Sequence, residues 1–142
     1  MKWSLRGGMA FVMLAFLGAA CSSDMTSTTA PTTPTPTTVT ITETFQGNLN
    51  QNGAATYSFG VAAGAVTATL TSLGPDSPLA IGMGLGTLIS GSCAVAIAND
   101  NAMQGAVVSG TVSSAGTVCL RVYDVGNIVR PLAYSVDVVH PQ

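Results

Sequence analysis

Alternation of apolar and polar side chains at every second position is the feature that most limits the fold of this chain. In residues 39–45, Val39, Ile41 and Phe45 share one face, and threonine occupies all three positions on the other. A half-buried strand has this period, whereas an amphipathic helix repeats every 3.6 residues. Because no stretch beyond residue 38 sustains helical spacing, we predict an all-β domain.

Seven further segments have strand character, and turn residues such as Asn52-Gly53 and Gly74-Pro75-Asp76 separate some of them. The eight predicted strands cover residues 39–45, 57–61, 66–70, 79–85, 93–98, 106–112, 117–125 and 132–139. Strands this short and numerous fit an antiparallel β-sandwich of two sheets over residues 39–142. In the later strands we expect these side chains to face inward: Val118, Leu120, Val122, Tyr134, Val136 and Val138.

The N-terminus has the pattern of an export signal. Lys2 and Arg6 form a positive region, and residues 9–20 are an uninterrupted apolar run. Such a run is typical of a signal peptide, and it is too short to span a bilayer as a helix, which takes about 20 residues. We therefore expect residues 1–20 to be removed.

The residues before Cys21 resemble a bacterial lipobox, since Leu17-Gly18-Ala19-Ala20 ends in small side chains. The resemblance implies a diacylglycerol on Cys21 and acyl chains that hold the mature protein to a membrane. It departs from the usual pattern at Gly18, where leucine is common. Ser22, which is not aspartate, resembles an outer-membrane address. The alternative is ordinary cleavage near Ala20, which would release the protein.

A polar segment follows the cysteine. Residues 22–38 hold eight threonines, three serines and three prolines. This composition cannot bury a core and favours extended backbone. We interpret residues 21–38 as a linker, with O-glycosylation of its threonines left open.

Three cysteines occur in the chain, and assigning Cys21 to lipid leaves Cys93 and Cys119. Export favours a disulfide between them, although two buried free thiols remain an alternative. Cys119 alternates with the inward candidates Val118 and Leu120, so we expect it to face away from the core. Cys93 shares the parity of Val95 and Ile97, and a bulge or strand end near it would reconcile the two cysteines.

The second half of the domain resembles the bacterial pre-peptidase C-terminal (PPC) domain. A polar turn at residues 99–101 precedes a strand entry, Ala115-Gly116-Thr117, which leads into Arg121-Val122, and a last strand of Tyr-x-Val-x-Val type begins at Tyr134. The resemblance covers residues 44–140 and implies a jelly-roll-like β-sandwich that is not itself catalytic. Some members of the family bind calcium or extracellular polymers.

Charge and residue inventory exclude several classes of function. Residues 21–142 carry two arginines against six acidic residues, a formal charge of −4, so there is no basic stripe for nucleic acid. The single histidine, His140, is third from the C-terminus, where we expect a solvated tail rather than a catalytic base. The scattered acids do not suggest a glycosidase pair. We predict no enzyme activity and no cofactor.

Three remaining features have structural interpretations beside functional ones. Gly82, Gly84 and Gly86 lack the spacing of a nucleotide-binding loop, so we expect them to flatten one sheet face or allow close backbone approach. Arg121 and Tyr123 share a strand face and are expected to cover the sheet, or else to form a small patch for a sugar or peptide.

The third feature is a run of oxygen-bearing side chains, Asn99, Asp100 and Asn101, which Asp124 or Asp76 would approach in a calcium site. We expect these residues to act as turn formers instead, because Asn and Asp bond to local backbone. The sequence thus predicts no metal site, with these three residues as the calcium candidates.

The chain as a whole is expected to be a lipid-anchored cell-envelope protein, at the outer membrane, with a non-catalytic β-sandwich. The sandwich is expected to bind an envelope polysaccharide or protein. The alternative is a surface coat module with no specific ligand.

Overall fold

The computed structural model describes residues 37–74 and 79–142. The leader, Cys21 and nearly all of the predicted linker lie outside the described residues, as does Asp76. No helix among the described residues is long and apolar enough to cross a membrane. The described residues belong to one compact unit, and the hydrophobic core that they form lies within it.

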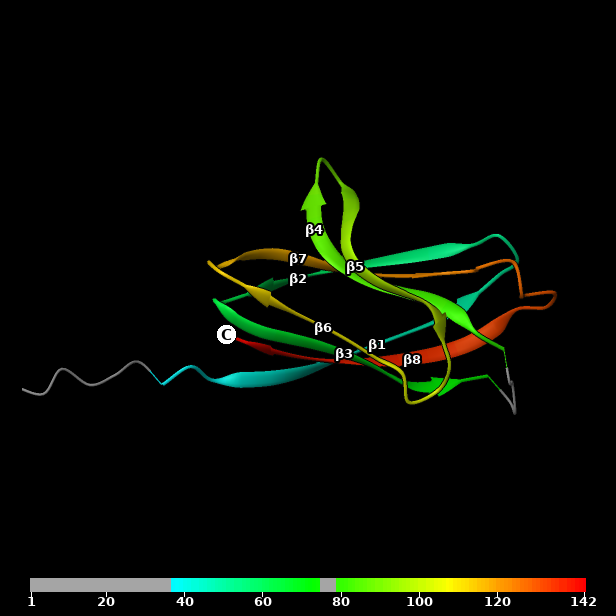
Figure 1. The fold of residues 1–142 in the computed structure, drawn as a ribbon, viewed down its shortest axis with the longest axis horizontal. Coiled ribbons are helices and arrows are strands. Elements are labelled where there is room, and N and C mark those ends of the chain that lie inside the picture. The colour runs from blue at the N-terminus through cyan, green and yellow to red at the C-terminus, as the bar shows by residue number, and fades with distance from the viewer. Residues whose placement is uncertain (1–36, 75–78) are drawn as a thin grey trace, which may run out of the picture. The chain divides into compact units, whose positions relative to one another are not determined.

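Eight strands build the domain, as the alternation predicts. In chain order they are β1 (Thr40–Leu49), β2 (Ala54–Val61), β3 (Gly64–Leu73), β4 (Ile81–Ile89), β5 (Ser92–Ala102), β6 (Val107–Val112), β7 (Gly116–Tyr123) and β8 (Leu132–Pro141). They form two four-stranded antiparallel sheets, with orders β1-β8-β3-β6 and β2-β7-β4-β5 (Figure 1).

This strand order is that of a jelly roll. The antiparallel pairs nest, because β1 pairs with β8, β2 with β7, β3 with β6 and β4 with β5. The chain therefore folds as one long hairpin, with β4 and β5 at its tip, rolled into a sandwich. The predicted all-β sandwich is confirmed.

The core lies between the two sheets and follows the predicted faces. Ile41 and Phe45 turn inward on β1, whereas the threonines beside them are exposed. All six inward candidates of the later strands are buried. Because side chains of a strand point alternately to its two faces, the face of one residue determines the faces of all the others in a regular strand.

The hairpin of β4 and β5 differs from prediction, because both strands run past their expected ends. Asn99, Asp100 and Asn101 belong to β5 rather than to a turn after it. Met83 pairs with Asn99 and Ile81 with Ala102, so β5 carries an extra residue here. The side-chain oxygen of Asn99 accepts a hydrogen bond from the amide of Asn101 at 2.9 Å, which stabilises this bulge.

Candidate functional site

A disulfide joins Cys93 on β5 to Cys119 on β7, with the Cα atoms 5.8 Å apart. The predicted pairing is therefore confirmed. Neither cysteine belongs to the core between the sheets, although both are buried. The bond lies on the outer face of the β2-β7-β4-β5 sheet, and it links strands that have β4 between them.

A bulge brings the two cysteines to the same face, as the conflict of parities suggested. Leu85 of β4 pairs with Ile97, but the next residue, Gly86, pairs with Val95. The extra residue on β5, Ala96, reverses the face on which the β5 side chains between Ala96 and the hairpin tip lie. Ile97 consequently shares the inner face of Leu85, and Cys93 shares the outer face.

Glycine on β4 lets β5 bend over the sheet. A Cβ on Gly86 would collide with the main-chain carbonyl of Ala94 and would lie 2.7 Å from the Cα of Val95. A Cβ on Gly84 would lie 2.6 Å from a methyl carbon of Val95. The prediction that these glycines allow close backbone approach is thus correct. Figure 1 shows the result, a β4–β5 hairpin that rises out of the sandwich.

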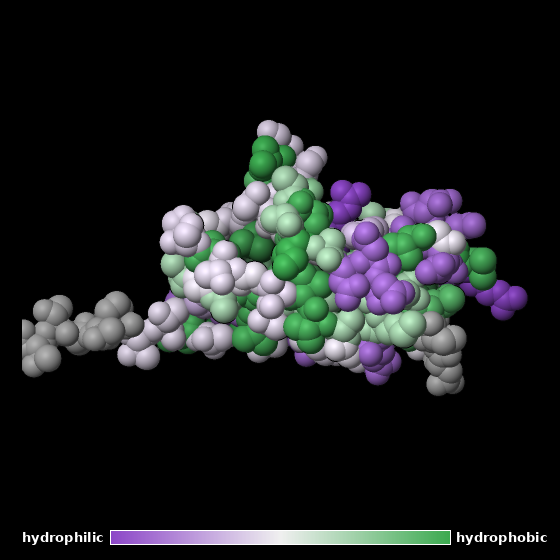
Figure 2. Space-filling view, viewed as in Figure 1, coloured by the Kyte–Doolittle hydropathy of each residue, from purple (hydrophilic) through white to green (hydrophobic). Residues whose placement is uncertain are grey.

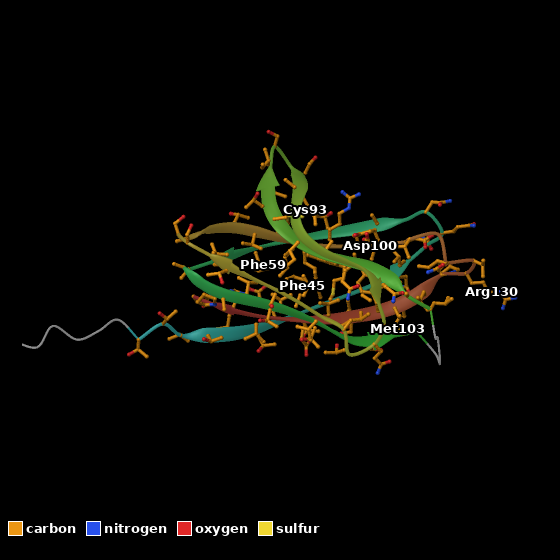
Figure 3. The ribbon with its side chains drawn as sticks, in the orientation of Figure 1. Phe45, Phe59, Cys93, Asp100, Met103 and Arg130 are labelled. Atoms are coloured by element: carbon orange, nitrogen blue, oxygen red, sulfur yellow. A yellow bond between two sulfur atoms is a disulfide. The ribbon has the colours of Figure 1, made fainter. Side chains whose placement is uncertain are left out.

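The raised hairpin exposes apolar side chains. Ile89 near its tip is 59% exposed, Val95 is 38% exposed and Ile97 is 43% exposed. Figure 2 shows apolar residues running from the hairpin down across this face of the domain, where Met103, labelled in Figure 3, is half exposed. Val107, the first residue of β6, is also about half exposed. Contiguous exposed apolar residues on a folded domain commonly mark an interaction surface.

A pocket of about 380 Å³ opens where β5 rises away from β6. Its volume is within the range of ligand sites. It is lined by five branched aliphatic residues, Val66, Leu85, Ile97, Val112 and Val118, and by the hydroxyl-bearing residues Thr87, Thr111, Ser113, Ser114 and Thr117. Small residues complete the lining, and they are Gly86, Ala96, Gly110, Ala115 and Gly116.

The chemistry of the pocket is that of binding. Its lining residues offer apolar contact, hydroxyl groups and the backbone of strand ends, and none of them is ionisable or aromatic. Sequence reasoning missed this pocket, because Ser113-Ser114-Ala115-Gly116 looks like an ordinary turn. These residues become a wall of the pocket only because β5 and β6 separate beside them.

Charged and aromatic groups gather away from the pocket. Tyr123 donates a hydrogen bond to Asp100, and the guanidinium of Arg121 lies 6.0 Å from the ring centre of Tyr123. The hydrogen bond to Asp100, helped by burial, raises the pKa of Tyr123. The ring also covers Gly82, where a Cβ would collide with it. Arg121 and Tyr123 thus cover the sheet face, as expected.

The calcium candidates do not form a cluster. The side-chain oxygen of Asn99 accepts a hydrogen bond within its own bulge, and Asp100 accepts a hydrogen bond from the hydroxyl of Tyr123. Asp124 accepts hydrogen bonds from four backbone amides, those of Asn52, Gly126, Asn127 and Ile128. Within residues 37–74 and 79–142, no three His, Cys, Asp or Glu side chains are grouped as metal ligands.

His140 is not the solvated tail residue that the sequence predicts. It belongs to β8, its side chain is fully buried, and its ring centre lies 5.0 Å from that of Phe59. Its Nε2 is 3.3 Å from a carboxylate oxygen of Glu43. The reason is register: β8 pairs with β1 along its whole length, so the last strand extends almost to the C-terminus.

The described part of the chain is therefore a disulfide-bonded jelly roll with an apolar pocket at one pair of edge strands. No family model matches the chain, and no curated protein does so either. Among solved structures it is similar to Aeromonas hydrophila PliG, a periplasmic lysozyme inhibitor of g-type lysozyme. The two are 16% identical with a TM-score of 0.49, over 71% of this chain and 86% of that one. A likeness at this level assigns no activity.

Proposed function

We propose that this chain is a lipid-anchored protein of the bacterial cell envelope whose jelly-roll domain is a non-catalytic binding module. Its anchor is lipid on Cys21, which follows a signal peptide and precedes a threonine- and proline-rich tether. Ser22 directs it to the outer membrane. The domain is a member of the PPC type, on the strength of the short motifs in its second half.

The observation that carries the binding role is the pocket beside the raised hairpin. Burying Ile89, Val95 and Ile97 would be favourable, yet the fold holds all three partly in solvent, and Ile97 lines an uncharged cavity. The Cys93–Cys119 disulfide, and the close approach of β5 to Gly84 and Gly86 of β4, keep the hairpin in this position. Exposed apolar side chains held in this way lower the stability of the domain unless a partner covers them.

Mass spectrometry of the mature N-terminal peptide tests the anchor. We expect an acylated peptide that begins at Cys21 in the wild type, and an unacylated precursor for Cys21→Ser. A wild-type peptide that begins after Ala20 without added mass would contradict the proposal of an anchor and leave the binding role to be tested by itself.

Capture from envelope extract tests the binding role. Gly110 lines the pocket, and a Cβ there would meet only a methyl group of Ile97, at 3.9 Å. Gly110→Val therefore places a branched side chain in the pocket, and its Cβ meets no backbone atom within 4 Å. Gly60→Val is the matched control, because a Cβ on Gly60 of β2 meets nothing within 4 Å. We expect wild type and Gly60→Val to retain the same partner and Gly110→Val to lose it. Equal recovery by all three, or nothing specific, would favour a coat module.

A further inference from the structure

The pocket lies between two strands that each pair on one side only. β6 ends the β1-β8-β3-β6 sheet and β5 ends the other, and the two lie against each other before the hairpin rises. An edge strand presents a row of backbone N–H and C=O groups to any further strand. Between Ser92 and Ala98, and along the whole of β6, neither edge carries a charge or a proline.

The opposite side of the sandwich, where β1 and β2 are the edge strands, is better protected against pairing with a further strand. There Phe45 of β1 stacks on Tyr57 of β2, with ring centres 4.9 Å apart, and closes the seam between the sheets. Glu43 of β1 points inward toward His140. An inward-pointing charge is one of the devices by which proteins keep an edge strand from pairing. The β5–β6 side lacks it.

β6 is the more regular of the two free edges. Its pairing with β3 runs from Val112 to Val107 without a register shift, whereas β5 is interrupted by two bulges. Gly110 lies on β6 with its missing side chain toward Ile97, so the pocket opens directly beside this edge. A strand added to β6 would therefore direct a side chain into the pocket.

The lining of the pocket narrows the class of ligand. Without an aromatic ring there is no surface on which a sugar ring stacks, and without a basic group there is no partner for a carboxylate or phosphate. Branched aliphatic walls suit a branched aliphatic side chain. An uncharged pocket between uncharged edges also matches an uncharged segment, because a charge placed there would lose its water without compensation.

We propose that the β6 edge binds an uncharged, extended polypeptide segment as an added strand, with one branched aliphatic side chain of that segment in the pocket. This inference rests on the proposed binding role. Backbone hydrogen bonds along residues 109–112 would supply much of the affinity, and the pocket would supply the specificity, as in other cases of strand addition.

Fluorescence anisotropy with synthetic peptides tests this. The probe is a labelled nine-residue peptide of alternating threonine and valine, added to the mature protein purified from cells, in phospholipid nanodiscs where it carries lipid. We expect saturable binding that weakens at least tenfold when the central residues of the peptide are N-methylated, since these then lack the N–H of a strand. Replacing the valines with glutamate should have an effect of the same size.

Protein variants complete the test. Gly110→Val places a branched side chain in the pocket, and Ala96→Lys places a charge on β5 at the wall of the pocket. Each variant should weaken peptide binding at least tenfold. Gly60→Val and Thr42→Lys, made on exposed positions of other strands, should bind as the wild type does. Circular dichroism and thermal melting verify that all four are folded.

Two results would overturn the inference. One is a wild-type protein that binds the N-methylated peptide as well as the parent. The other is saturable binding of lauric acid, but not of the peptide, that Gly110→Val abolishes, because the pocket would then take an acyl chain. Either result leaves the binding role standing if the Gly110→Val protein still fails to capture the envelope partner.

Discussion

The main-chain carbonyl of Ala94 on β5 occupies the space in which a side chain on Gly86 of β4 would begin. Two paired strands of a flat sheet do not meet in this way, because their side chains stand clear of the neighbouring backbone. Here the bulge at Ala96 bends β5 over the outer face of β4. That bend carries Cys93 across to Cys119 and lifts the hairpin beside the pocket.

Replacing Gly86 with alanine should destabilise the domain by about 2 kcal/mol, because overpacking a site without free volume forces the backbone to move. Urea denaturation measures the change in the free energy of unfolding. Gly60→Ala is the control, since its Cβ meets no atom within 4 Å, and it should lie within about 0.5 kcal/mol of the wild type. Equal stability of the two variants would mean that β5 does not cross Gly86 closely.

Removing the disulfide with Cys93→Ala and Cys119→Ala together should cost about 3.5 kcal/mol, because the bond closes a loop across a separation of 26 residues. Denaturation with and without a reductant measures this, and the reductant should affect only the wild type. Alkylation of Cys93 in denatured, unreduced protein would instead indicate free thiols.

The two tyrosines at the β1–β2 seam should respond unequally to loss of their hydroxyl groups. Tyr57 donates to the carbonyl of Gln46 at 2.9 Å, so its single proton is used, and Tyr134 must donate to Tyr57 at 2.7 Å. Tyr57→Phe removes both bonds and leaves a buried donor, at a cost of about 2 kcal/mol, whereas Tyr134→Phe should cost about 1 kcal/mol. Denaturation of the two variants compares them, and the reverse order would contradict this donor assignment.

Asp124 should make stability fall at acid pH. The amide of Asn52 is the main cause that lowers the pKa of this carboxyl, and the amides of Gly126, Ile128 and Asn127 add to it. A lowered folded-state pKa means that the stabilisation is present above the unfolded pKa of about 3.9 and is lost as the pH falls through the folded value. Asp124→Asn should therefore melt at a lower temperature than the wild type at pH 7. The two should converge toward pH 2, and a constant difference between pH 7 and pH 2 would exclude this cause.

Much of the fold could be predicted from the sequence because strand periodicity is local. The alternation around Ile41 and Phe45, and around Val118 and Leu120, places each side chain on a face without knowledge of its partner strand. The parity conflict between Cys93 and Cys119 predicts a bulge or a strand end near Cys93, and the structure has a bulge at Ala96. The glycines of β4 could likewise be assigned to close backbone approach, since nothing in their spacing suited a nucleotide.

Tertiary structure alone decided where the strands end and what their edges enclose. His140 looked like a tail residue because its burial depends on pairing with Ile41, about 100 positions earlier in the chain. The pocket depends on β5 leaving β6, which no local pattern encodes. Alternation thus determines the face of each side chain, but the neighbours of a strand are set by long-range pairing, and the candidate site is made of those neighbours.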